Sequence, residues 1–188
     1  LRPNCNPQEI MHLTCAAAVA MCDAVETAAG FRPGIKWTND LVYGKKKLGG
    51  ILTELSVNPQ THLVDSAIIG IGINCRLDNV PEELQGLACS LSDFVPEPDI
   101  SRLAAALILA LEETAHRLLT DRCAMMEAYR NRCVTLGRQV RVISPEKTET
   151  GFAESVCDDG SLTVLFADGQ RKNVNSGEVS VRGMYGYV

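Results

Sequence analysis

The stretch Lys36–Leu55, KWTNDLVYGKKKLGGILTEL, constrains the fold more than any other part of the sequence. Leu41–Tyr43 and Leu48–Leu55 have the composition of β-strands, and Gly44 and Lys45 between them are typical of a tight turn. Two adjacent glycines near a strand start weaken that strand by about 0.5–1 kcal/mol each relative to alanine. Such a cost usually indicates a bulge or a close approach to the backbone. The stretch therefore predicts a hairpin with unusually bare main chain.

The lysines that precede the glycines leave two interpretations open. Lys45 to Lys47 could supply positive charge to a phosphate or carboxylate lying along the bare backbone of Gly49 and Gly50. Alternatively, exposed lysines protect an edge strand and the glycines form a bulge in it. The spacing alone favours the second interpretation.

A second pair of glycines lies in IIGIGINC, within a predicted and largely buried strand, Leu63–Cys75. Alternation in a strand puts Gly70 and Gly72 on one face, where they leave either a channel for a ligand or room for a tightly packed helix. This strand ends in Asn74. No third glycine opens a helix after it, so the pattern is not that of a dinucleotide-binding site.

The rest of the chain predicts helices followed by short strands. Asn6 to Glu9 has the form of a helix start with a capping box, and Gly30 is placed to end that helix. Its apolar stripe comprises Met11, Cys15, Ala18, Cys22 and Val25. Gly34–Trp37 is predicted as a short strand, and NPQT at Asn58–Thr61 as a turn.

After a polar stretch that contains Pro81, Pro96 and Pro98, Asp99 or Ser101 is predicted to cap a second long helix. The apolar stripe of that helix comprises Leu103, Leu107, Leu111, Ala115 and Leu118. A shorter helix around Cys123–Cys133 follows and ends by Gly137.

From Arg138 the pattern alternates, and Asp159-Gly160 and Asp168-Gly169 are strong hairpin signals. We expect an SH3-like β-barrel of about 50 residues, which is marginal alone and leans on the preceding domain. The predicted domains are residues 1–136 and 137–188.

Composition excludes some classes of function. The net charge of −5 argues against generic binding to nucleic acid or an anionic membrane, so attraction for phosphate must be local. The longest apolar run, Leu103–Leu111, is too short to span a bilayer, and no signal peptide is visible. The eight cysteines occur singly, which favours small buried hydrophobic side chains in a reducing cytosol over a zinc site or a disulfide framework.

Together, KWTNDLVYGKKKLGGILTE and IIGIGIN resemble the motifs of the biotin protein ligases, the biotin–acetyl-CoA-carboxylase ligases. The resemblance extends over the whole chain. It implies an α+β fold in which a mixed sheet packs with helices, as in class II aminoacyl-tRNA synthetases, followed by the SH3-like barrel. One departure is Thr38, which stands where that family usually has proline; we expect a mild effect.

The resemblance also implies a two-step reaction. Biotin and ATP, with Mg²⁺, form biotinyl-5′-AMP, and the biotinyl group then passes to one lysine of a biotin carboxyl carrier protein. The resemblance implies a cytoplasmic enzyme and allows a homodimer. A repressor role, found in part of the family, depends on a helix-turn-helix for DNA, which these residues neither contain nor exclude.

Positions that match the family motifs carry the implied site. Lys47 resembles the lysine that contacts biotin and the phosphoryl linkage, and Asp40 resembles a residue that binds magnesium or orients the acceptor lysine. The other implied binding residues are Asn39 on the nucleotide side, Gly49, Gly50 and Ile51 along the strand wall, and Gly72, Ile73 and Asn74 near biotin and ribose.

The family's Gly-Arg-Gly-Arg-type biotin-binding loop has no match in the 188 residues. The chain therefore resembles the C-terminal portion of a ligase, and we expect it to be inactive alone and its sheet to have an unpaired edge that favours self-association. Two alternatives stay open: a lipoate–protein ligase with the same adenylate chemistry, and a non-catalytic fragment that binds a partner.

Overall fold

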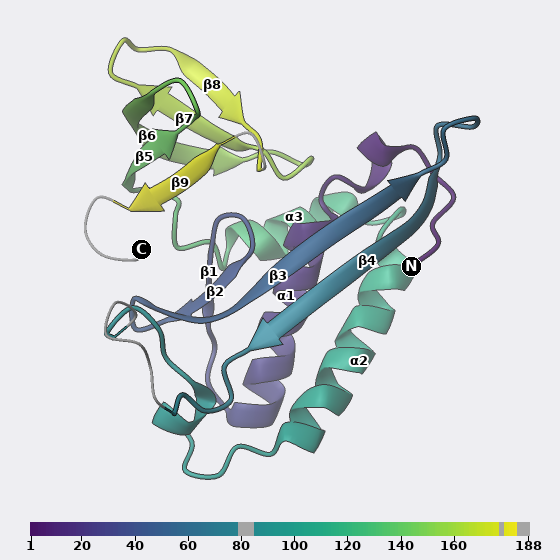
Figure 1. Ribbon diagram of the computed structural model, residues 1–188, viewed down its shortest axis with the longest axis vertical. Coiled ribbons are helices and arrows are strands. Elements are labelled where there is room, and N and C mark those ends of the chain that lie inside the picture. Colours follow the sequence, from purple (N-terminus) through teal and green to yellow (C-terminus); the bar gives the residue numbers. More distant parts are fainter. Residues whose placement is uncertain (79–84, 177–178, 184–188) are drawn as a thin grey trace.

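The computed structural model describes residues 1–78, 85–176 and 179–183, which form two β-sheets and three α-helices (Figure 1). The larger sheet has the strand order β1-β2-β3-β4, with β1 (Gly34–Lys36), β2 (Asp40–Tyr43), β3 (Lys46–Val57) and β4 (Val64–Ile73). The smaller sheet has the order β8-β7-β6-β5-β9, with β5 (Gln139–Ile143), β6 (Thr148–Val156), β7 (Leu162–Phe166), β8 (Arg171–Val174) and β9 (Ser180–Gly183).

The long strands β3 and β4 lie side by side, and the smaller sheet stands apart at the upper left (Figure 1). The helices are α1 (Leu13–Ala29), α2 (Ile100–Arg117) and α3 (Arg122–Arg130), with short 3₁₀ turns at η1 (Pro7–Ile10) and η3 (Leu91–Asp93). Both α2 and α3 pack against α1, and α1 packs against β3. The molecule is therefore an α+β fold, as predicted.

All pairings between the named strands are antiparallel, so the prediction of a mixed sheet is wrong for the part that the structure describes. The strands follow one another through tight turns, and such turns join only antiparallel neighbours. The turn between β2 and β3 has positive φ at both Gly44 and Lys45, at 55° and 69°, which is the hairpin turn expected from the sequence.

The first predicted helix is present but divided. Asn6 caps η1 with the predicted capping box, and α1 then begins at Leu13. Gly30 ends α1 with a left-handed φ of 76°. Met11 is 47% exposed because it lies in the turn before α1 and not in the helix. The helix α1 itself is buried on nearly all sides rather than along one stripe.

The second predicted helix begins at the first of its two proposed caps. Asp99 accepts a hydrogen bond from the backbone amide of Arg102 at 2.9 Å. The third helix is shorter than predicted, ending at Arg130, although Gly137 does have a positive φ of 74°.

Strand β4 is half-buried rather than largely buried. Ile69, Ile71 and Ile73 pack against the core, whereas Ile68 on the other face is 63% exposed. The continuous apolar run resembles that of a strand covered on both sides, but the described helices cover only one face of this sheet. The polar stretch predicted after it includes Pro81, which lies outside the described residues.

The predicted hairpins of the C-terminal part are confirmed. Gly160 and Gly169 have φ of 89° and 80° at the tips of the β6–β7 and β7–β8 turns. The last predicted strand is found as β9, although residues 177–178 of that motif lie outside the described residues.

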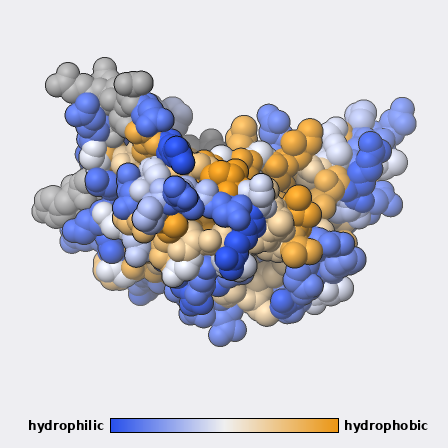
Figure 2. Space-filling model, turned by 90° about the horizontal axis from the view of Figure 1, so that it is seen from below, coloured by the Kyte–Doolittle hydropathy of each residue, from blue (hydrophilic) through white to orange (hydrophobic). Residues whose placement is uncertain are grey.

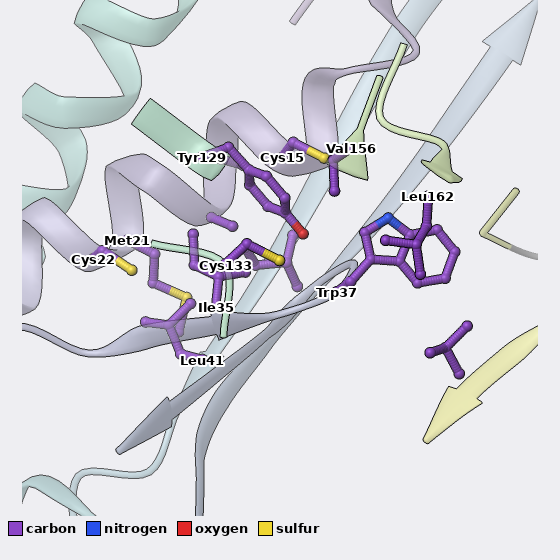
Figure 3. Close-up of a cluster of buried hydrophobic side chains, with 14 of the residues drawn as sticks. Cys15, Met21, Cys22, Ile35, Trp37, Leu41, Tyr129, Cys133, Val156 and Leu162 are labelled. Atoms are coloured by element: carbon purple, nitrogen blue, oxygen red, sulfur yellow. The ribbon is translucent and has the colours of Figure 1, made fainter. Parts of the chain in front are cut away.

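The smaller sheet is fastened to the larger one through buried polar contacts as well as apolar packing. The indole Nε1–H of Trp37 donates to the carbonyl oxygen of Gly160 at 2.9 Å, and the ring lies beside Leu162 of β7 (Figure 3). The hydroxyl of Tyr129 donates to the carbonyl oxygen of Thr38 at 3.0 Å. Arg130 donates to the carbonyl oxygen of Val156 at 2.6 Å. Together they tie the turn between β1 and β2 to the smaller sheet and to α3, and α3 to β6.

Replacing Trp37 with phenylalanine should lower the free energy of unfolding by about 1–3 kcal/mol, because the buried carbonyl of Gly160 loses its donor. Urea unfolding of the two proteins, followed by circular dichroism, measures this difference. Tyr129→Phe, which strips the donor from Thr38 O, should give a loss of the same order. Equal stability of Trp37→Phe and the unchanged protein would show that the carbonyl finds water instead.

Five cysteines are buried as small apolar side chains, as predicted: Cys5, Cys15, Cys22, Cys89 and Cys133. Cys123 is an exception and is exposed.

One helical stretch, Pro7–Ala29, passes a length and hydropathy test for crossing a membrane, but 67% of the tested window is buried inside the molecule, as in a core helix. On the face seen from below, apolar surface gathers in the middle, between hydrophilic flanks (Figure 2).

Candidate active site

A one-residue bulge in β3 decides which side chains share the open face of the sheet. The register with β2 pairs Val42 with Lys47 and Leu41 with Gly49, so Leu48 is the extra residue. Leu48 and Gly49 both point inward and are buried. Lys47 and Gly50 consequently meet on the outer face, where regular alternation would have separated them.

An ion pair lies over this bulge. Lys47 Nζ is 2.6 Å from Asp40 Oδ1, and the two side chains are 39% and 17% exposed. A Cβ added at Gly50 would lie 3.2 Å from that carboxylate oxygen and 3.3 Å from Lys47 Nζ. The bare backbone of Gly50 therefore lets the charged pair rest directly on the sheet.

The glycine pair divides between the two faces of the sheet. A Cβ at Gly49 would lie 2.5 Å from Met21 Cε and 2.5 Å from the carbonyl oxygen of Gly72, so packing beneath the sheet requires glycine there. Gly50 pairs in register with Gly72 on the outer face. The edge-strand interpretation is therefore wrong, because β3 lies between β2 and β4 and the extra residue of its bulge is Leu48 rather than either glycine. The stretch does present charge beside bare backbone, as the first interpretation held.

Packing does not require glycine at the outer positions of β4. A Cβ at Gly72 would meet nothing closer than Gly50 O at 4.0 Å, and one at Gly70 nothing closer than Leu52 O at 3.6 Å. Both glycines are exposed, so the helix-packing interpretation of this pair is wrong. Gly50, Gly70 and Gly72 form an uncovered strip, here called the glycine floor, that begins at the Lys47–Asp40 pair.

The remaining predicted residues frame this floor through their backbones and amides. Asn39 and Ile51 exchange two hydrogen bonds, Asn39 Nδ2 to Ile51 O at 2.6 Å and Ile51 N to Asn39 O at 3.0 Å. Asn74 Nδ2 donates to Cys89 O at 3.0 Å and to Lys47 O at 3.3 Å. The side chains of Ile51 and Ile73 face the core, so only their main chain adjoins the floor.

A cavity of about 340 Å³ adjoins Asp40 and reaches the smaller sheet. It is lined by Lys36, Trp37, Thr38, Asn39, Asp40, Ser176, Val179, Ser180, Val181 and Arg182. Neither Lys36 nor Arg182 was among the site residues predicted from the sequence. The register of the β1–β2 hairpin, which pairs Lys36 with Asp40, could have revealed Lys36. No local signal in the sequence links Arg182 to this site.

Lys36 and Lys47 interact with Asp40, and Arg182 lines the same cavity. Burial lowers the pKa of Lys36, and the nearby positive charges of Lys47 and Arg182 act in the same direction, against the opposing effect of Asp40. Lys36 and Arg182 both line the cavity and present positive charge to it, and such charge attracts a phosphate or carboxylate. The cavity is therefore suited to a phosphate group.

The metal expected from the resemblance can be tested on donor chemistry. Among the described residues, no group of three or more His, Cys, Asp or Glu side chains could hold a metal ion. Mg²⁺ is usually bound by one or two carboxylates together with substrate phosphates. Asp40, which lines the cavity, fits that pattern as a single protein ligand.

Comparison with known families identifies the class of protein in which this strip of bare strand, ion pair and charged cavity occur. Residues 1–74 match the model of the Biotin/lipoate A/B protein ligase family, and residues 135–182 match that of the Biotin protein ligase C terminal domain. The chain belongs to the biotin protein ligase family.

Two curated relatives show how much of such proteins the chain covers. It is 33% identical over 176 residues to the bifunctional ligase/repressor BirA of Bacillus spizizenii, covering 92% of this chain and 54% of that protein. It is 32% identical over 172 residues to the biotin–[acetyl-CoA-carboxylase] ligase of Mycobacterium tuberculosis, covering 89% and 61%. The chain thus spans about half the length of the curated relatives it matches.

Solved structures agree on the fold. The apo biotin protein ligase of Aquifex aeolicus superposes with a TM-score of 0.81 at 25% identity, covering 95% of this chain and 79% of that one. The same enzyme in complex with biotin and ATP gives a TM-score of 0.79 at 24% identity, covering 95% and 75%.

Proposed function

We propose that this chain supplies one wall of the active site of a biotin protein ligase. The enzyme would activate the carboxylate of biotin with ATP and transfer the biotinyl group to a lysine of a biotin carboxyl carrier protein. The observation that carries the proposal is the Lys47–Asp40 pair resting on bare Gly50, next to Gly70 and Gly72, where packing does not require glycine. A flat ligand can lie on such a floor with its charged end at the lysine.

The first step joins two anions. A carboxylate oxygen of biotin attacks the α-phosphorus of ATP, the bond from that phosphorus to the bridging oxygen breaks, and pyrophosphate leaves. At a separation of about 4 Å and an effective dielectric constant of about 20, repulsion between two unit charges is about 4 kcal/mol. The ammonium of Lys47 is placed to offset much of it.

In the second step the neutral amine of the acceptor lysine attacks the acyl carbon. The bond from that carbon to the phosphate oxygen breaks, AMP leaves, and the amine loses a proton as the amide forms. Asp40, which is ion-paired with Lys47 beside Gly50, is suited to orient the incoming amine.

Lys36 and Arg182 in the adjoining cavity would hold the phosphates that leave. Asp40 would hold Mg²⁺ against the same phosphates, and the ion would neutralise their charge. Asn39 would line the nucleotide side of the site. Gly72 and the backbone of Asn74 would line the side that holds biotin and the ribose.

The domain division also belongs to this proposal. Residues 1–136 would form part of the catalytic domain, and residues 137–188 an SH3-like barrel that completes the phosphate cavity through β9. Such an enzyme would work in the cytoplasm, where its carrier protein and ATP are found. Lipoate ligation is the second possibility within the matched family, but the match at residues 135–182 to a biotin ligase domain favours biotin.

The test is formation of biotinyl-5′-AMP, detected by mass spectrometry after incubation with biotin, ATP and Mg²⁺. The 188 residues alone should form none, because they contain no Gly-Arg-Gly-Arg-type loop. A chimera that joins the corresponding upstream segment of the Bacillus relative to Leu1 should form it readily. Turnover by the 188 residues alone would contradict the role given to the loop. A chimera active with lipoate but not with biotin would contradict the choice of substrate.

A further inference from the structure

The hydroxyl of Thr38 is a buried polar group without a hydrogen-bond partner among the residues that the structure describes. Thr38 is only 7% exposed and lies in the turn between β1 and β2. Its carbonyl oxygen accepts a hydrogen bond from the hydroxyl of Tyr129 at 3.0 Å, so the turn itself is anchored. A buried hydroxyl without a partner costs stability, and such a group in a native fold calls for an explanation.

Position 38 is also where this sequence departs from the usual motif of the biotin protein ligases, which have proline there. Proline has no side-chain hydroxyl to donate. Any contact that the hydroxyl of Thr38 makes is therefore an addition to the contacts that the usual motif provides.

Thr38 lines two cavities. One is the cavity of about 340 Å³ beside Asp40, and the other, of about 390 Å³, is lined by the start of α1, by β3 and by the turn between β6 and β7. Asn39 and Ser176 also line both, so the two cavities adjoin at Thr38. The β-carbon of threonine carries a hydroxyl and a methyl group, and one rotation of about 120° around χ1 exchanges them. The hydroxyl can therefore turn toward a ligand that lies beside it.

The charges of the two cavities differ, and this difference selects the occupant. Lys36 and Arg182 line the cavity beside Asp40, whereas the only charged residue among those described around the second cavity is the acidic Asp159. A phosphate group is therefore attracted to the first cavity rather than to the second. Phosphate oxygens accept several hydrogen bonds each, and a hydroxyl supplies a further donor without adding charge.

We propose that the hydroxyl of Thr38 donates a hydrogen bond to a phosphate oxygen of bound ATP and of the pyrophosphate that leaves it. This role for Thr38 rests on the proposed function, because that reaction brings the phosphates into the cavity. A hydrogen bond to a charged oxygen is stronger than one between neutral groups. It also satisfies a hydroxyl that has no partner within the described chain. Thr38 thus adds affinity for the nucleotide beside the cations of Lys36 and Arg182.

The test uses inorganic pyrophosphate as the probe and a complete ligase, made by joining the upstream segment of the Bacillus relative to Leu1. Thr38→Val removes the hydroxyl and keeps the branched shape, so the affinity for pyrophosphate in a calorimetric titration should fall by about tenfold. Thr38→Ser keeps the hydroxyl and should stay within about threefold of the unchanged ligase. Thr163→Val is the matched control. The Thr163 hydroxyl donates to Asn173 Oδ1 at 2.9 Å and the residue lines neither cavity, so the affinity should not change.

Two further measurements separate this role from a purely structural one. Thr38→Val should unfold at the same temperature as the unchanged ligase or at a higher one, because it removes a buried hydroxyl that lacks a partner. It should raise the KM for ATP by about tenfold and leave kcat within about twofold, because the contact exists both before and during the chemical step.

The outcomes for Thr38 and for the proposed function can be told apart. If the unchanged ligase forms biotinyl-5′-AMP but Thr38→Val binds pyrophosphate as tightly, the role of Thr38 is overturned and the proposed function stands. If no biotinyl-5′-AMP forms, the proposed function is contradicted, and the pyrophosphate titration still decides the role of Thr38. An unchanged ligase that does not bind pyrophosphate, or a loss of affinity that Thr38→Ser shares, would also overturn this role.

Discussion

Replacing Lys47 with alanine should slow the formation of biotinyl-adenylate by about a thousandfold in a complete ligase built from this chain. The ammonium offsets a repulsion of about 4 kcal/mol between carboxylate and phosphate, and each 1.36 kcal/mol corresponds to a factor of ten in rate. The side chain is 39% exposed before ligand binds, so closure of the site over the ligand is needed for the full effect. Removing a single fixed donor from comparable sites costs factors of a hundred to a thousand.

The neighbouring Lys46 provides the control for this measurement. Lys46 is exposed on the same hairpin and forms no ion pair among the described residues, so Lys46→Ala should be nearly neutral. Lys45 at the turn should behave in the same way. Single-turnover release of pyrophosphate measures the chemical step directly. A loss below about fivefold in Lys47→Ala would place this lysine outside the reacting centre.

The sequence was most informative where the determinants of structure are local. The β2–β3 hairpin could be predicted because Gly44 and Lys45 select one turn type, and the helix ends because Asn6, Asp99 and Gly30 act on their own backbone. These are interactions over three or four residues. The shared face of Gly70 and Gly72 followed from the period of a strand.

What failed were statements that depend on distant parts of the chain. The exposure of one face of β4 depends on where the helices pack, and the division of Gly49 from Gly50 depends on a bulge opposite Leu41 and on Met21. Arg182 reaches the cavity because the smaller sheet is fastened by Trp37, a contact across most of the sequence. A period or a motif carries no signal for such contacts.

Replacing Gly72 with leucine should weaken the binding of a biotinyl-adenylate analogue by about ten- to a hundredfold while leaving the fold intact. No atom lies closer than 4.0 Å to the position of an added Cβ, so a larger side chain projects freely into the space above the floor. Any ligand that lies there must then move away. Overpacking of this kind costs about 1–3 kcal/mol, which is about ten- to a hundredfold in affinity.

Gly49 makes the interpretation of that loss unambiguous. Gly49→Ala should reverse the pattern, with a clear drop in the unfolding midpoint, because its new methyl group meets Met21 Cε and Gly72 O at 2.5 Å. Calorimetric titration and thermal unfolding of both variants, in the complete ligase, separate affinity from stability. If Gly72→Leu binds the analogue as tightly as the unchanged protein, the ligand does not lie on this face. Glycine at positions 70 and 72 would then need another explanation, because neither side-chain packing nor a positive φ requires glycine there.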